Sequence, residues 1–318
     1  MSNGRVIQAL APVRTWTFVT IGTWALVATL STSAHPSPVC ADKSEVSRLV
    51  TAISGPNSLR LDDASEVVIL GTLLPQKFDN RSSIGAWPPA IAAAQTLARV
   101  AVGKSIALIE PLATRDRYGR RRGQIFVQTG DERIWLQALL LRLGQARVDV
   151  AGLPVTCARL LLDYERQARQ AKRGLWDNGA YHIRQASRPR DLLRYRSSFQ
   201  IVRGRVRDVA RTRTRVYVNF GDEWRTDFTA GLSRSIARTY ARHETDVARL
   251  KGKLIEVRGW IERRGGPFIQ VRHTAQIAVI RDRKRDAVPN AAWRRPGHRQ
   301  RPQTKKHPTD QQSGVFDL

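Results

Sequence analysis

The stretch SIALIEPLATRDRYGRRRGQIFVQTG, residues 105–130, places an arginine-rich turn between two apolar segments. Both segments are short and rich in isoleucine and other large apolar residues, which is typical of β-strands. Between them, arginines are concentrated around one aspartate, one tyrosine and two glycines, at what looks like a tight turn. The stretch therefore predicts an antiparallel hairpin with guanidinium groups gathered at its tip.

The hairpin belongs to a longer pattern of strands and helices. Residues 50–76 alternate apolar runs with turns, which predicts three strands. Three stretches have helical spacing, and the first two end at glycines: residues 88–104, 131–144 and 154–176. The order predicts a small five-stranded barrel with three helices over residues 44–185, in a chain that is mainly β with helices (α+β).

Several landmarks of this region resemble the thermonuclease family, whose type member is staphylococcal nuclease. They are Arg117-Tyr118-Gly119-Arg120 before a hydrophobic strand, and a closing helix that ends in Gly174-Leu175-Trp176. The resemblance covers about residues 48–185. It implies an OB-type five-stranded barrel with three helices, and calcium-dependent hydrolysis of phosphodiester bonds in DNA and RNA.

The resemblance also locates the family's catalytic positions, and most of them are changed. Pro56 and Leu73 stand where the family has metal-binding aspartates, and Gln76 stands where it has the general-base glutamate. Val68 replaces the first catalytic arginine, so that Arg120 alone is retained. A leucine cannot ligate calcium and a glutamine cannot accept a proton. The sequence therefore predicts a degenerate site without metal or cofactor, and calcium is expected only if the family's activity is retained.

Other carboxylates could substitute for the missing ones. Asp62 and Asp63 suit a turn, Asp79 follows Gln76, and Glu66 lies on the same strand face as Val68. None of them forms a cluster with metal-ligand spacing, and the histidines are scattered. We interpret Glu66 as a surface residue and the Asp62-Asp63 pair as turn residues.

A second periodic segment, residues 197–280, predicts another OB-like barrel. It resembles the C-terminal module of many exported bacterial thermonuclease-like proteins, through VYVNFGDEWRTDF and VRGWIERRGGPFI. The expected elements are five strands and one helix between the third and fourth: strands at 199–209, 214–220, 226–231, 253–263 and 268–280, and a helix at 233–249.

Exposed aromatic residues beside arginines could bind nucleic acid in both segments. In the first, we expect Arg120, Arg117 and Tyr118 to contact phosphate or bases, and the remaining arginines of the hairpin to be turn and rim charges. In the second, Trp224 lies in a polar loop and is the best stacking candidate. Other aromatics there are expected mainly in the core (Tyr217, Phe228, Trp260), and arginines near them are candidates for a basic groove (Arg205, Arg207, Arg215, Arg225, Arg258).

The N-terminus has the pattern of a secretory signal peptide. Arg5 and Arg14 precede the apolar residues 15–30, and small residues follow, with cleavage expected after Ala34 or Ala41. Residues 1–41 therefore predict an exported protein, periplasmic or secreted; a retained N-terminal membrane anchor is the alternative.

The two cysteines, Cys40 and Cys157, exclude a disulfide framework and a cysteine-based metal site. A single bridge between them remains open only if cleavage follows Ala34, because cleavage after Ala41 removes Cys40.

The charge of the chain favours polyanionic partners. Its 318 residues carry a formal net charge of +27, and residues 281–318 form a basic, proline-containing tail that we expect to be disordered. We interpret the protein as a thermonuclease-like binder of nucleic acid or another polyanion. An active nuclease with substitute residues and a protein-interaction scaffold at the envelope are the alternatives.

Overall fold

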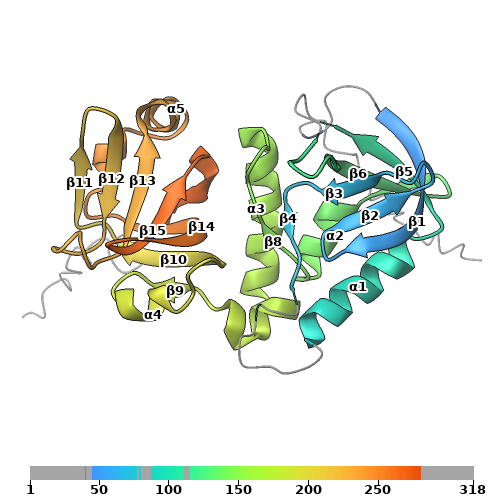
Figure 1. Ribbon diagram of the computed structural model, residues 1–318, viewed down its shortest axis with the longest axis horizontal. Helices are drawn as coiled ribbons and strands as arrows, with labels where there is room; N and C mark the ends of the chain where they lie inside the picture. The colour runs from blue at the N-terminus through green and yellow to red at the C-terminus, as the bar shows by residue number, and fades with distance from the viewer. Residues whose placement is uncertain (1–39, 41–44, 77–78, 80–86, 111–114, 281–318) are drawn as a thin grey trace, which may run out of the picture. The chain divides into compact units, whose positions relative to one another are not determined.

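The computed structural model describes residue 40, residues 45–76, residue 79, residues 87–110 and residues 115–280. The expected signal peptide and the basic tail lie outside these residues, apart from Cys40. The mainly β architecture with helices is confirmed (Figure 1). No described helix has both the length and the apolar character needed to cross a membrane.

The first sheet contains the arginine-rich hairpin expected at residues 105–130. Its strands are β1 (Glu45–Gly55), β2 (Ser58–Leu61), β3 (Glu66–Ile69), β5 (Ser105–Ile109), β6 (Arg121–Thr129) and β7 (Glu132–Trp135). β1 pairs with both β2 and β5, β2 pairs with β3, and β3 runs parallel to β6. Because β5 and β6 are antiparallel neighbours, the five pairings close into a ring, and the expected hairpin is confirmed.

Three helices accompany this sheet, as expected: α1 (Pro88–Ala101), α2 (Leu136–Arg142) and α3 (Val155–Gln170). Pro88 and Pro89 start α1, where a missing N–H costs nothing. The expectation that the second helix begins at residue 131 is wrong, because residues 132–135 pair with β6 instead. The third helix is also shorter than expected. It stops at Gln170, and residues 174–177 form a 3-10 turn.

Two short strands, β4 (Thr72–Leu73) and β8 (Arg147–Val148), pair beside this sheet. A disulfide joins Cys40 to Cys157 on α3, so the bridge that the sequence left open is present. It ties the residue that precedes β1 to the helix that follows β8.

The second sheet has the order β11-β12-β13-β15-β14-β10-β9, with β16 beside β14. Its strands are β9 (Arg184–Gln185), β10 (Phe199–Arg205), β11 (Asp208–Arg211), β12 (Arg215–Asn219), β13 (Thr229–Ser233), β14 (Leu254–Arg264), β15 (Gly266–Val271) and β16 (Ile277–Val279). The helices are α4 (Pro189–Leu193) and α5 (Arg234–His243).

Three elements of this region are shorter than expected. The strand expected at 199–209 breaks between β10 and β11, and the segment expected at 268–280 divides into β15 and β16. The helix expected at 233–249 ends at His243, and a 3-10 turn follows at Val247–Leu250. α5 lies between β13 and β14 in chain order. These are the strands expected at 226–231 and 253–263, so the position of the helix is as expected.

The buried apolar side chains form two main clusters, one drawn from residues 40–161 and one from residues 186–277. Phe228 belongs to the second cluster, as expected, but Tyr217 is only half-buried. Trp260 was also expected in the core and is 48% exposed. It lies opposite Phe199 in the pairing of β10 with β14, and the two rings form a T-shaped contact.

Candidate functional site

The tip of the β5–β6 hairpin is a turn organised by Asp116. Its Oδ1 accepts hydrogen bonds from the backbone N–H groups of Tyr118 (2.9 Å) and Arg120 (3.0 Å), and its Oδ2 accepts one from Arg120 Nε at 2.9 Å. Desolvation opposes ionisation of this carboxyl, but the bonds from Arg120 and Tyr118 outweigh it and lower its pKa. Gly119 provides the positive φ of 77° that closes the turn.

This turn presents Tyr118 to solvent close to two guanidinium groups. The side chain is 67% exposed, and the Cζ atoms of Arg117 and Arg120 lie 4.8 Å and 5.2 Å from its ring centroid. An aromatic ring held in this way can stack on a base while the arginines reach adjacent phosphates. The structure therefore brings together three of the residues that the sequence singled out.

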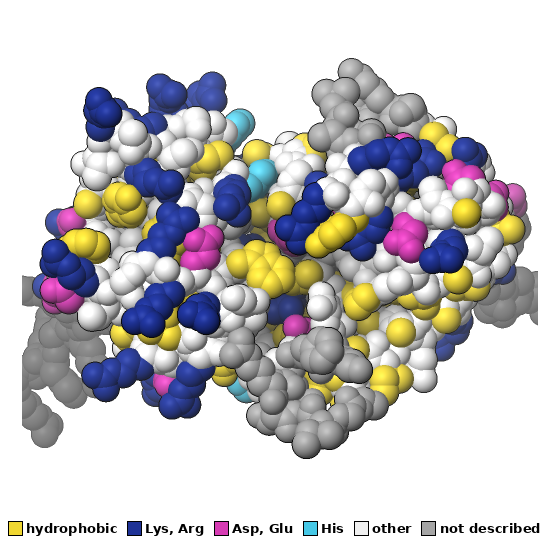
Figure 2. All heavy atoms as spheres, in the orientation of Figure 1, with side chains coloured by type: hydrophobic (Ala, Val, Ile, Leu, Met, Phe, Trp, Pro, Cys, Tyr) yellow, Lys and Arg dark blue, Asp and Glu magenta, His cyan; other side chains and the backbone are white. Residues whose placement is uncertain are grey.

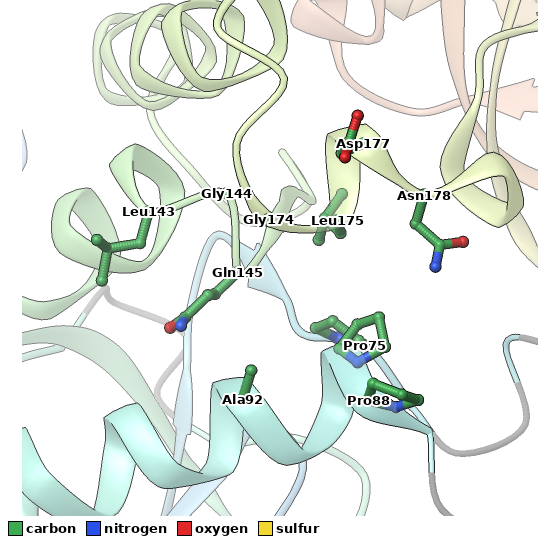
Figure 3. A pocket seen from close by; sticks show the side chains of 11 residues that line it. Pro75, Pro88, Ala92, Leu143, Gly144, Gln145, Gly174, Leu175, Asp177 and Asn178 are labelled. Carbon is green, nitrogen blue, oxygen red and sulfur yellow. The ribbon is translucent and has the colours of Figure 1, made fainter.

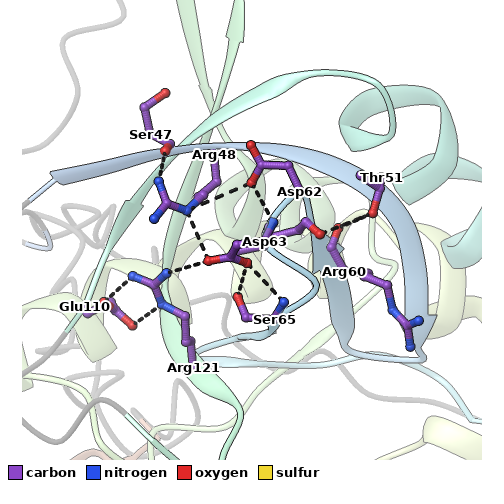
Figure 4. A network of polar contacts seen from close by, with 10 residues as sticks. Ser47, Arg48, Thr51, Arg60, Asp62, Asp63, Ser65, Glu110 and Arg121 are labelled. Carbon is purple, nitrogen blue, oxygen red and sulfur yellow. Dashed lines mark hydrogen bonds and ion pairs between the residues drawn. The ribbon is translucent and has the colours of Figure 1, made fainter.

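Arg121 was expected to be an exposed charge at the rim of the hairpin, but the structure shows it in an ion pair. It donates two hydrogen bonds to Glu110, at 2.9 Å and 2.7 Å, and its side chain is only 13% exposed (Figure 4). These bonds raise its pKa. Such a pair fixes the base of the hairpin, so Arg121 is structural.

The Asp62-Asp63 turn lies beside Arg121. Asp63 accepts hydrogen bonds from the side chain and backbone of Ser65, which lower its pKa to about 2, with Arg48 contributing (Figure 4). The interpretation of this pair as turn residues is confirmed.

The positions at which the resemblance places the family's catalytic groups hold apolar residues and one amide. Pro56 and Gln76 line the same cavity of about 370 Å³, together with Trp87 and apolar residues of α1. Leu73 pairs with Arg147 across β4 and β8, and Val68 pairs with Arg122 across β3 and β6. One amide among apolar side chains does not supply the oxygen ligands that calcium needs. These residues therefore do not fit a calcium ion.

The nearby carboxylates are engaged elsewhere. Glu66 lies 3.2 Å from the guanidinium of Arg60. Asp79 accepts hydrogen bonds from the hydroxyl of Tyr181 (2.8 Å) and from Arg147 (3.4 Å). Within the described part of the chain, no three His, Cys, Asp or Glu side chains are grouped so as to hold a metal ion.

A second cavity of about 370 Å³ lies beside the start of α1 (Figure 3). Its other side is formed by two chain segments whose backbones approach each other at Gly144 and Gly174. Pro75, Pro88 and Leu175 line it, with Gln145, Asp177 and Asn178 as its polar groups. Among the described residues that line it, none has a cationic side chain.

The second sheet carries two exposed tryptophans. Trp224 is 56% exposed, and Arg225 Cζ lies 4.6 Å from its ring centroid. This contact resembles that of Arg117 with the ring of Tyr118. Trp260 is the other, and sequence reasoning missed it because its apolar neighbours favoured a core position.

The basic groove expected near these aromatics is not assembled as predicted. Arg258 is buried in an ion pair with Glu165, so it cannot contact a ligand. Arg207 pairs with Asp222 at 2.6 Å, and Arg215 donates to the side chain of Gln270 at 2.7 Å. Most of the predicted groove residues therefore have intramolecular partners.

Glu165 and Arg258 connect the two sheets, which lie within one compact unit. Glu165 on α3 accepts hydrogen bonds from Arg258 on β14, at 2.8 Å and 3.0 Å, and from the backbone N–H of Val148 at 2.6 Å. Desolvation lowers the pKa of Arg258, but the carboxylate of Glu165 outweighs it and raises the pKa overall. Sequence reasoning had no signal for this pair, because its members are 93 residues apart.

A second ionic contact uses Glu256 of β14. It accepts hydrogen bonds from Arg169 on α3 at 2.9 Å and from Arg203 on β10. Arg147 also reaches across, donating to the backbone oxygen of Phe199 at 2.7 Å. Both faces of β14 are thus covered, one by the second core and the other by α3.

Residues 80–178 match the family model described as staphylococcal nuclease homologue. This part of the chain is therefore similar to staphylococcal nuclease. The match includes the hairpin turn with Tyr118 and Arg120, whereas Pro56, Leu73 and Gln76 precede it. A search of the curated proteins found none that matches the chain.

Proposed function

We propose that the protein binds single-stranded nucleic acid through its nuclease-like domain and does not cleave it. The observation that carries this proposal is the platform formed by Arg117, Tyr118 and Arg120, which lies in the matched region and exposes the ring of Tyr118 to solvent. Unpaired bases can stack on an exposed ring, whereas bases inside a duplex cannot reach it. The net charge of +27 supports a polyanionic ligand.

The absence of cleavage is proposed from the residues at the catalytic positions. Proline, leucine and glutamine replace the groups that would hold a metal or activate water. Two carboxylates could replace the missing ones, and both already have partners. Glu66 contacts Arg60, and Asp79 contacts Tyr181 and Arg147. Carboxylate oxygens that already accept bonds from these partners are less available to a metal ion or to a water molecule.

The test is a fluorescence-anisotropy titration of labelled single- and double-stranded DNA, with gel analysis of the same samples in calcium and in EDTA. We expect no cleavage in either. Tyr118→Ala should weaken single-strand binding by about 1–3 kcal/mol if a base stacks on the ring. Arg120→Ala should cost about 1.5–3 kcal/mol if its contact with phosphate is desolvated.

Arg60→Ala is the matched control, because it removes one exposed, ion-paired arginine outside the platform. Cleavage that EDTA abolishes would overturn the non-cleaving part of the proposal. Equal binding by wild type, Tyr118→Ala and Arg120→Ala would remove the platform as a site and favour the protein scaffold.

We propose further that the protein is exported. The signal-like pattern of residues 1–41 supports this, and so does the Cys40–Cys157 disulfide, because such bonds persist mainly in oxidising compartments. A retained N-terminal anchor is the alternative.

A further inference from the structure

Helix α5 carries a row of arginines on one face. Arg234, Arg238 and Arg242 are four residues apart, so they lie above one another on the helix surface, and all three are exposed. The opposite face packs on the second core through the fully buried Tyr240 and through Ile236 and Ala237. Figure 2 shows dark blue side chains gathered at the upper left, where Figure 1 places this helix.

Helix stability accounts for Arg242, which lies in the last turn where a cation suits the helix dipole, but it does not account for the row as a whole. Like charges at a spacing of four residues destabilise a helix, and a cation in the first turn opposes the helix dipole. α5 contains no acidic residue that could offset them. Its N-terminus is capped instead by Ser233, whose hydroxyl accepts a hydrogen bond from the N–H of Ile236.

The nearby carboxylates are also paired elsewhere. Glu244 lies 2.5 Å from Arg159 of α3, and Asp246 pairs with Arg211 of β11. Among the described residues, no carboxylate forms an ion pair with any arginine of the row. Arg234 donates to the backbone oxygen of Thr212, and Arg242 to the hydroxyl of Thr239.

The row fits a chain of phosphates. Four residues advance a helix by about 6 Å, so successive guanidinium groups can grip successive phosphates of one strand. An open hollow of about 530 Å³ lies along the helix, lined by Arg238, Arg242, Ser235, Thr239 and Ala241. None of these residues is aromatic, so the surface can bind phosphate but cannot stack on bases.

We propose that this face of α5 is a second nucleic-acid site, which binds the phosphate backbone without regard to sequence or strandedness. The inference rests on the proposed nucleic-acid binding and adds a contact outside the matched region. The two sites then have different chemistry. Tyr118 selects unpaired bases, and α5 adds affinity that depends on salt for single and double strands alike.

The test uses the full mature chain with Arg238→Gln and Arg242→Gln combined, because glutamine keeps the length and helix propensity of these positions. Anisotropy titrations at several salt concentrations give the slope of log affinity against log salt. Loss of two phosphate contacts should reduce this slope by about 1.4 for single strands and about 1.8 for duplex DNA. Circular dichroism checks that α5 is intact.

The matched control combines Arg60→Gln and Arg166→Gln, which removes the same charge from exposed arginines paired with Glu66 and Asp163. We expect its slopes to stay close to those of the wild type. Restoring charge with Arg238→Lys and Arg242→Lys should restore the slope.

Each outcome separates the two proposals. If the α5 variant matches the control while Tyr118→Ala still weakens single-strand binding, the α5 site is wrong and the proposed function stands. If the wild type binds neither DNA, both are wrong. A slope that falls only for single strands would also overturn the inference, because a phosphate contact serves both forms.

Discussion

Glu165→Gln should lower the free energy of unfolding by about 3–5 kcal/mol, because it leaves the guanidinium of Arg258 buried without a counter-charge. The two side chains are 1% and 7% exposed, so water cannot replace the lost partner. Glutamine also weakens the acceptor for the N–H of Val148, which now bonds Glu165 at 2.6 Å. Urea denaturation followed by circular dichroism measures the loss.

Two further variants show whether charge is the cause. Asp222→Asn breaks the exposed ion pair with Arg207, and we expect it to leave the free energy of unfolding almost unchanged. Replacing both buried partners, with Glu165→Leu and Arg258→Met, should recover part of the loss because no unpaired charge remains. A Glu165→Gln protein as stable as the Asp222→Asn protein would contradict the prediction.

Removing the disulfide should cost about 2–5 kcal/mol, because the bond limits the conformations of the unfolded chain. It joins residues that are 117 apart in the sequence, and Cys157 lies fully buried on α3. The measurement compares the wild type with the Cys40→Ala/Cys157→Ala variant, each with and without reductant. Reductant should destabilise only the wild type, and equal stability in all four samples would show that the bond contributes nothing.

The same bond makes the site of cleavage testable. If the exported protein keeps Cys40 in the bridge, its N-terminus should be His35 and not Asp42, because cleavage after Ala41 discards Cys40. Intact mass and N-terminal sequencing of protein from outside the cytoplasm give the answer. An uncleaved chain in the membrane fraction would favour the anchor.

Some of the fold could be predicted from the sequence because the relevant contacts are local. Pro88 and Pro89 start α1, and Gly103 follows it with a φ of 73°. Asp63 bonds Ser65 two residues away, and Asp116 bonds Tyr118 and Arg120 within one turn. Patterns of this kind appear directly in the order of residues.

The predictions from the sequence were wrong where contacts with distant segments determine the local structure or the burial of a side chain. Residues 132–135 have helical spacing, but their ladder with β6 makes them a strand, and Trp135 Nε1 donates to Gln124 at 2.9 Å. Trp260 has apolar neighbours in the sequence, yet its side chain is 48% exposed beside Phe199 of β10.

For the candidate site too, some features could be predicted from the sequence and others could not. The sequence by itself determined the hairpin turn with its exposed aromatic and arginine residues, and it predicts that the family's catalytic carboxylates are replaced. Only the tertiary structure decided which arginines are open to a ligand. Arg121 and Arg258 are enclosed by Glu110 and Glu165, whereas Arg238 and Arg242 are exposed and in no ion pair with a described carboxylate. The physical reason is that the availability of a charge depends on the partners that folding brings to it, and these come from distant parts of the chain.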